Sequence, residues 1–256
     1  MKHSRTISFA SAIAIGTIAA SAAVPPPTLG YSCAPALGGF VGNERLHSDA
    51  VRGAKAAIEY FDPALCTGGG YPSGSSYWVA VAASGTYDIF QVGVVKCPTA
   101  RCGSPFSGTQ TAKFWAYGRE AGACGGRLEP TASYIGNISS GTLTYKIIRE
   151  NEGPWVFNAY ISTSLVAQKS EIALESCWGS VDYARYLHES KNLADQVGGQ
   201  SGDTQTWQSV YWHDGSAWSS VTDTPGSSCD LNGVSGVGCT WHSTDGTLWN
   251  VWDTRF

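Results

Sequence analysis

Two strand-like runs and the turn between them decide the fold class of this chain, and from Tyr77 to Lys96 they read YWVAVAASGTYDIFQVGVVK. Aromatic and β-branched residues fill both runs, Tyr77–Ala83 and Asp88–Lys96, and Ser84-Gly85-Thr86 separates them. Short runs of this kind, bounded by turn residues, are typical of β-strands. The stretch therefore predicts two consecutive strands of a sheet.

Similar runs recur on both sides of this pair, at Ala54–Phe61, Lys113–Arg119, Gly141–Arg149 and Trp155–Val166. Two Asp-Gly turns between aromatic residues, within 212–218 and 241–249, predict two hairpins. The segment Ser180–Gly199 fits a helix or a strand, and its periodicity leaves both open. Only 14% of the residues are charged and one is Met, which disfavours a helical bundle. We therefore expect an all-β protein, a single-domain antiparallel β-sandwich.

The first 22 residues have the pattern of a secretory signal peptide. A cationic start, Met1–Arg5, precedes an uncharged apolar stretch at 7–20, and Ala20-Ser21-Ala22 supplies the small residues of a cleavage site. Residues 23–50, which include Pro25-Pro26-Pro27, are expected to form an N-terminal arm or a short pro-segment, and 51–256 the sandwich domain. The sequence thus predicts a secreted, extracellular and soluble protein without a membrane span.

Eight cysteines follow the predicted signal peptide, and an even number of cysteines in a secreted chain predicts disulfides. We expect Cys229 to pair with Cys239 first of all, and Cys124 to pair with Cys97 or Cys102. The chain has no C-x-x-C pair and its histidines are scattered, so neither a metal nor a cofactor is expected. The net charge of −4 argues against a nucleic-acid partner, and we expect a monomer.

A polar residue, Gln91, stands inside the second strand-like run, where burial is expensive unless its amide is hydrogen-bonded. A period of two places it on one face with Ile89, Gly93 and Val95, and places Phe90, Val92 and Val94 on the other. The two segments Trp78-Val79-Ala80-Val81 and Ile89-Phe90-Gln91-Val92-Gly93 together resemble the glutamic peptidases, or eqolisins. That family has W-V-G-I-D-G in the first strand and I-L-Q-T-G in the second, and its Gln is catalytic.

A further motif of the family, A-E-[FW]-I-[IV]-E-D, is similar to Ala184–Ser190, which reads ARYLHES. Arg185 stands where the family has its first acid, and Glu189 stands where it has the second Glu, which we take as catalytic. The resemblance favours a strand at Tyr183–Ser190 and implies a concanavalin A-like jelly roll. A looser resemblance links the chain to secreted actinobacterial proteins.

The resemblance implies a secreted endopeptidase with a catalytic pair, Gln91 and Glu189. Glu189 would act as general base on a water, and the Gln91 amide would donate to the developing oxyanion. The pair is expected on neighbouring strands of one concave face, where Trp78, Trp115 and Tyr117 bind a polypeptide substrate. The alternative is a non-catalytic, lectin-like sandwich that binds a glycan or a peptide.

Overall fold

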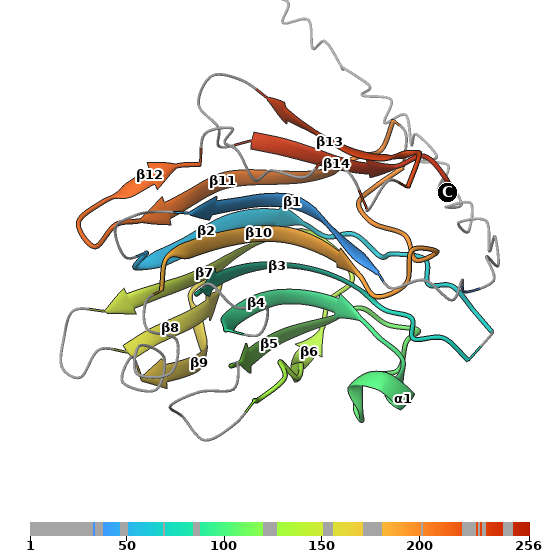
Figure 1. Ribbon diagram of the computed structural model, residues 1–256, viewed down its shortest axis with the longest axis horizontal. Helices are drawn as coiled ribbons and strands as arrows, with labels where there is room; N and C mark the ends of the chain where they lie inside the picture. The colour runs from blue at the N-terminus through green and yellow to red at the C-terminus, as the bar shows by residue number, and fades with distance from the viewer. Residues whose placement is uncertain are drawn as a thin grey trace, which may run out of the picture.

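Two antiparallel sheets pack into a single-domain sandwich in the computed structural model (Figure 1). The structure describes residues 33, 38–46, 51–68, 70–83, 88–119, 127–150, 156–170, 181–200, 202–221, 229, 231, 234–242 and 248–256. The one helix of these residues is the single turn α1 (Thr99–Cys102). The predicted all-β sandwich is confirmed.

The first sheet has six strands in the order β1-β10-β3-β4-β5-β6 and lies toward the viewer in Figure 1. Its strands are β1 (Gly39–Leu46), β3 (Ser75–Ala82), β4 (Ile89–Lys96), β5 (Ala112–Gly118), β6 (Ser133–Asn137) and β10 (Tyr183–Ser190).

The second sheet has eight strands in the order β13-β14-β11-β2-β7-β8-β9, with β12 paired beside β11. Its strands are β2 (Gly53–Glu59), β7 (Thr142–Glu150), β8 (Val156–Ile161), β9 (Ser164–Ser170), β11 (Gln205–His213), β12 (Trp218–Ser220), β13 (Val237–His242) and β14 (Leu248–Asp253).

The main hydrophobic core lies between the two sheets, because alternate residues of each strand point inward. The six-stranded sheet contributes Val79, Val81, Phe90, Val92, Val94 and Tyr186, and the eight-stranded sheet contributes Ile58, Tyr145, Ile147, Phe157, Trp207 and Trp249. On β4 the inward residues are Phe90, Val92 and Val94, as the period of two predicts, so Gln91 points away from this core.

The strand boundaries follow the sequence closely, with two instructive differences. The run Trp155–Val166 is not one strand but β8 and the start of β9, separated by a turn in which Ser162 has a φ of 54°. The undecided segment Ser180–Gly199 contains a strand, β10, followed by a loop. Pairing on both edges, with β1 and with β3, makes it extended.

An edge strand comes from the segment expected to lie outside the sandwich. Residues 39–46 form β1, which pairs with β10 from Gly39↔Ser190 to Leu46↔Tyr183. Cys33, just before it, is disulfide-bonded to Cys66. This part of 23–50 therefore belongs to the sandwich and covers the edge of β10.

Three disulfides join six of the cysteines: Cys33–Cys66, Cys97–Cys102 and Cys229–Cys239. The expected bond between Cys229 and Cys239 is confirmed. A bond from Cys124 to Cys97 or Cys102 is wrong, because those two cysteines bond to each other across the turn of α1. Cys124 and Cys177 lie outside the described residues.

Candidate functional site

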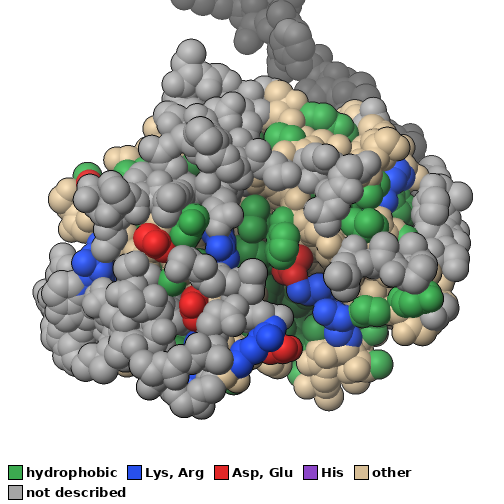
Figure 2. All heavy atoms as spheres, viewed as in Figure 1, with side chains coloured by type: hydrophobic (Ala, Val, Ile, Leu, Met, Phe, Trp, Pro, Cys, Tyr) green, Lys and Arg blue, Asp and Glu red, His purple; other side chains and the backbone are tan. Residues whose placement is uncertain are grey.

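A second apolar cluster covers the outer face of the six-stranded sheet, the face turned away from the other sheet. Its members are Trp78, Ala80, Ala82, Ile89, Val95, Cys97, Phe106, Ala112, Phe114 and Ala116. Every residue of β3 is consequently buried, which explains its uninterrupted apolar sequence. Figure 2, in the view of Figure 1, shows a hollow near the middle of the molecule with hydrophobic side chains at its bottom and charged side chains around it.

Gln91 lies on this outer face between two alanines. It is level with Ala80 of β3 on one side and with Ala116 of β5 on the other. The residue is only 8% exposed, and no hydrogen bond joins its amide to a residue that the structure describes. Its amide is not among the fully buried polar atoms that lack a partner, and as a donor and acceptor on this apolar face Gln91 is a candidate ligand-binding group.

Glu189 lies on the same face, at the β1 side of the sheet, and is tied to its own neighbours. The indole Nε1 of Trp78 donates to its Oε2 at 3.2 Å, and Ser76 Oγ donates to the same oxygen at 3.4 Å. The Lys191 ammonium forms an ion pair with its other oxygen. With a side chain only 11% exposed, this carboxylate has the contacts of a structural anchor.

The expectation that Gln91 and Glu189 lie on neighbouring strands is wrong. β3 runs between them, and Glu189 is level with Ser76 whereas Gln91 is level with Ala80. Four residues along a strand and two strand spacings across the sheet put their Cα atoms about 16 Å apart. Side chains stand roughly perpendicular to a sheet, so they do not close such an offset to the span of one water.

The residue of β10 that is level with Gln91 is Arg185, which pairs with Ala80 from the opposite side. We call Arg185, Ala80, Gln91 and Ala116 the Gln91 row. The Arg185 guanidinium lies over the ring of Tyr183, 5.2 Å from its centroid, and Glu44 of β1 is opposite Arg185 in register. The row therefore carries the amide of Gln91 and the cation of Arg185, with Ala80 between them. Its member on β10 is not an acid.

Only one of the three expected aromatic residues lies on this face. Trp78 does, with 2% exposure, and its indole is engaged by Glu189. Trp115 and Tyr117 point the other way, because their neighbour Ala116 shares the face of Gln91. Both pack against the inter-sheet core, with the Lys169 ammonium 5.1 Å from the Trp115 ring and 4.8 Å from the Tyr117 ring.

The aromatic residue that β5 contributes to the outer face is Phe114, which sequence reasoning missed. It is level with Gly93, and Gly93 is level with Trp78. A Cβ on Gly93 would lie 2.7 Å from both Cα and Cβ of Trp78, so glycine is required for this close approach. If the register had been known, Ala116 would have been identified as the partner of Gln91. Phe114, two residues from Ala116, would then have been placed on the same face.

A serine and a histidine lie in hydrogen-bond contact elsewhere, but not at a surface. Ser75 Oγ is 2.9 Å from His188 Nε2, and both residues are 0% exposed. The Gly198 N–H donates to His188 Nδ1 at 3.0 Å, and Gln205 Oε1 lies 3.2 Å from the same nitrogen. Burial lowers the pKa of His188 to about 3, which keeps the imidazole neutral. Because no substrate reaches a fully buried serine, this pair supports the fold.

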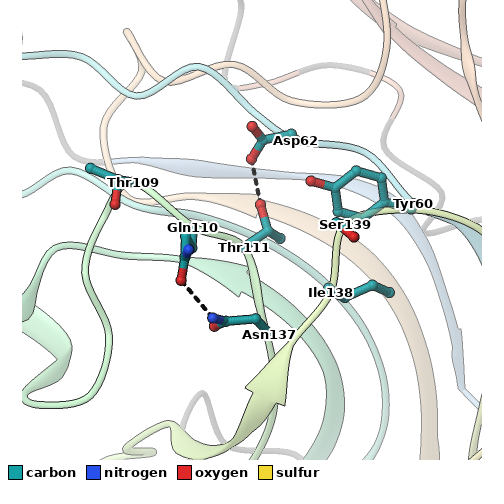
Figure 3. A pocket seen from close by; sticks show the side chains of 8 residues that line it. All are labelled: Tyr60, Asp62, Thr109, Gln110, Thr111, Asn137, Ile138 and Ser139. Carbon is teal, nitrogen blue, oxygen red and sulfur yellow. Dashed lines mark hydrogen bonds between the residues drawn. The ribbon is translucent and has the colours of Figure 1, made fainter.

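A small polar pocket of about 150 Å³ lies at one end of the sandwich, away from the Gln91 row (Figure 3). Its lining residues are Tyr60, Asp62, Thr109, Gln110, Thr111, Asn137, Ile138 and Ser139. They satisfy one another: Thr111 donates to Asp62, Asp62 pairs with Lys96 at 3.0 Å, and Asn137 donates to Gln110 at 2.5 Å. Paired groups of this kind stabilise the end of the sandwich.

Neither a metal-binding group nor a membrane-spanning helix is found in the described part of the chain. It contains no group of three or more His, Cys, Asp or Glu side chains arranged to hold a metal ion. Nor does it contain a helix long and apolar enough to cross a membrane.

The fold is that of the glutamic peptidases. Two crystal structures of scytalido-glutamic peptidase with transition-state analogues match this chain with TM-scores of 0.55 and 0.56 at 12% identity. SCP-B, a member of the eqolisin family in complex with the tripeptide Ala-Ile-His, matches with a TM-score of 0.55 at 11% identity. Each match covers 85% of this chain and 98% of the other. No protein-family model and no curated sequence matches the chain.

Proposed function

We propose that this chain is a secreted peptide-binding protein, which has the glutamic-peptidase fold but does not hydrolyse its ligand through Gln91 and Glu189. An extended peptide binds along the outer face of the six-stranded sheet. The Gln91 amide, nearly buried and without a partner among the described residues, is the observation that carries this proposal.

The chemistry of the Gln91 row suits a peptide group. A Gln side chain offers one carbonyl acceptor and two N–H donors, which complement the N–H and C=O of a main chain. Ala80 and Ala116 on either side have no atoms beyond Cβ and are themselves buried, so a ligand would meet this row at Gln91, which is 8% exposed. Trp78 and Phe114, two residues further along their strands, are buried and form the apolar floor next to the amide.

Hydrolysis by the expected pair is not part of the proposal. A general base has to lie within hydrogen-bond reach of the attacking water, and that water has to lie near the oxyanion donor. Glu189 is four residues away from the Gln91 row and is bonded to Trp78, Ser76 and Lys191. The level position on β10 holds Arg185, which cannot serve as a base.

The test has two arms on the same protein. Fluorescently labelled denatured casein is first incubated with the protein from pH 2 to pH 8, and we expect no new fragments. Binding of the same casein is then measured for the wild type, Gln91→Ala and Gln208→Ala, the last being an exposed Gln on β11 of the other sheet. Gln91→Ala should weaken binding at least fivefold, and Gln208→Ala should leave it unchanged. Hydrolysis that Glu189→Gln abolishes would overturn the proposal in favour of the catalytic pair.

A further inference from the structure

A row of aromatic and cationic side chains crosses the outer face of the eight-stranded sheet, on the opposite side of the molecule from Gln91. Tyr211 of β11 is level with Lys55 of β2, Lys55 with Lys146 of β7, and Lys146 with Tyr160 of β8. We call these four residues the lysine row. Their neighbours along each strand, such as Ala54, Ala56, Tyr145 and Ile147, point into the core, so the row itself points outward.

The two lysines at its centre repel each other. Like charges directly opposite on antiparallel strands are destabilising, and their Cβ atoms lie only about 5 Å apart. Burial, and after it the charge of Lys146, lowers the pKa of Lys55. A sheet has no structural need for such a pair, whereas an anion held between the two ammonium groups would relieve the repulsion.

Aromatic rings fix the direction of both lysines. The Lys55 ammonium lies 4.7 Å from the centroid of Tyr211 and 4.4 Å from that of Trp218 on β12. The Lys146 ammonium lies 4.2 Å from the centroid of Tyr160. Contacts of this kind hold a cation in place at a modest gain in free energy, so both charges are positioned before a ligand arrives.

The acids near this face are already engaged. Glu150, further along β7, accepts a hydrogen bond from Tyr160 and interacts with the charge of Lys146, and Glu59, at the end of β2, accepts a hydrogen bond from the Thr206 N–H at 3.2 Å. Neither lies between the two lysines in the sheet register. The middle of the row therefore carries two positive charges on a surface whose ends are aromatic.

We propose that the lysine row binds an acidic polysaccharide, with carboxylate groups of the sugar units between and beside Lys55 and Lys146. The row spans three strand spacings, about 14 Å, which is long enough for a few sugar units. Its half-buried rings, Tyr160, Tyr211 and Trp218, give the apolar faces of those units a surface to pack on. The site is independent of the peptide site, because it is built on the other sheet.

Polygalacturonate is the probe, and fully methyl-esterified pectin is the uncharged comparison. The double variant Lys55→Gln/Lys146→Gln is compared with Lys96→Gln/Lys113→Gln, which removes the same charge from the six-stranded sheet. We expect the wild type to bind polygalacturonate but not the esterified polymer, with an affinity that falls as salt rises. The first double variant should lose at least tenfold in affinity, and the second should keep it.

Four outcomes would overturn the proposal: no binding by the wild type, binding that survives esterification, equal loss in both double variants, or equally tight binding of double-stranded DNA. The thermal midpoint is a second measurement on the same proteins. It should change little in Lys55→Gln/Lys146→Gln, because that change removes the like-charge repulsion together with the favourable ring contacts of the two ammonium groups. A large fall in the midpoint would mean that the lysines serve the fold alone, and would also overturn the proposal.

Discussion

His188 makes the stability of this protein depend on pH in a way that the structure specifies. The imidazole is fully buried, accepts from the Gly198 N–H, and lies 5.6 Å from the Tyr77 ring; Gln205 Oε1, 3.2 Å from Nδ1, offsets only part of the cost of burying a charge. Burial lowers its pKa from 6.5 to about 3. In the unfolded chain His188 takes up a proton near pH 6.5, while in the folded protein it stays neutral until about pH 3.

The direction and the size of the pH effect on the free energy of unfolding follow from this difference in pKa. Above pH 6.5 both states are neutral and His188 adds no pH dependence; between pH 6.5 and 3 only the unfolded state binds the proton, so folding weakens as pH falls. Each pH unit in that window lowers the free energy of unfolding by about 1.4 kcal/mol, or roughly 5 kcal/mol over the whole window. Below pH 3 the folded state is protonated too, and the loss ends.

Urea unfolding of the oxidised protein at pH 8, 6, 5 and 4 measures this effect. His188→Gln keeps an acceptor for the Gly198 N–H but does not titrate, so its stability should fall less with acid than that of the wild type. Between pH 6 and 4 the free energy of unfolding should fall by about 2–3 kcal/mol more in the wild type than in His188→Gln. His213→Gln, at a half-buried histidine whose pKa burial also lowers, is the comparison and should remove a smaller part of the pH dependence than His188→Gln.

Parallel pH profiles for the wild type and His188→Gln would refute the reasoning, because His188 would then titrate alike in both states. If His188→Gln does not fold, NMR titration of the wild-type imidazole gives the same answer. Protonation of the folded protein above pH 5 would contradict the neutral, buried histidine.

Three other perturbations test the site and the cross-links. Arg185→Glu places an acid on the Gln91 row, about 10 Å from Gln91 between Cα atoms, and should confer slow hydrolysis of denatured casein at acid pH; a folded but inert variant would contradict the register argument. Gly93→Ala should lower the free energy of unfolding by about 1–3 kcal/mol, because its Cβ would meet the Tyr77 carbonyl oxygen at 2.2 Å; an unchanged urea midpoint would count against it. Thiol titration of the denatured, unreduced protein should find no free cysteine, and two or more reactive thiols would refute the disulfide prediction.

Local sequence determined the strands and the faces of β4. Alternation in Ile89–Lys96 placed Gln91 on one face of the strand and the core residues Phe90 and Val92 on the other, without any knowledge of the partner strands. Turn chemistry likewise predicted the hairpin from β11 to β12 across Asp214-Gly215. These features depend on neighbours in the chain, so they can be read from one segment at a time.

Only the tertiary structure decided which residues meet across strands. Glu189 and Arg185 are both on the outward side of β10, and sequence cannot tell which of them is level with Gln91, because register is set by pairing with β3. The face of Trp115 was open for the same reason, since both faces of β5 carry apolar residues and a shift of one residue exchanges them. Likewise β1 became part of the sheet through pairing with β10, a strand about 140 residues further along the chain. Alternation is local and register is not, which is why the sequence located Gln91 but not its neighbour.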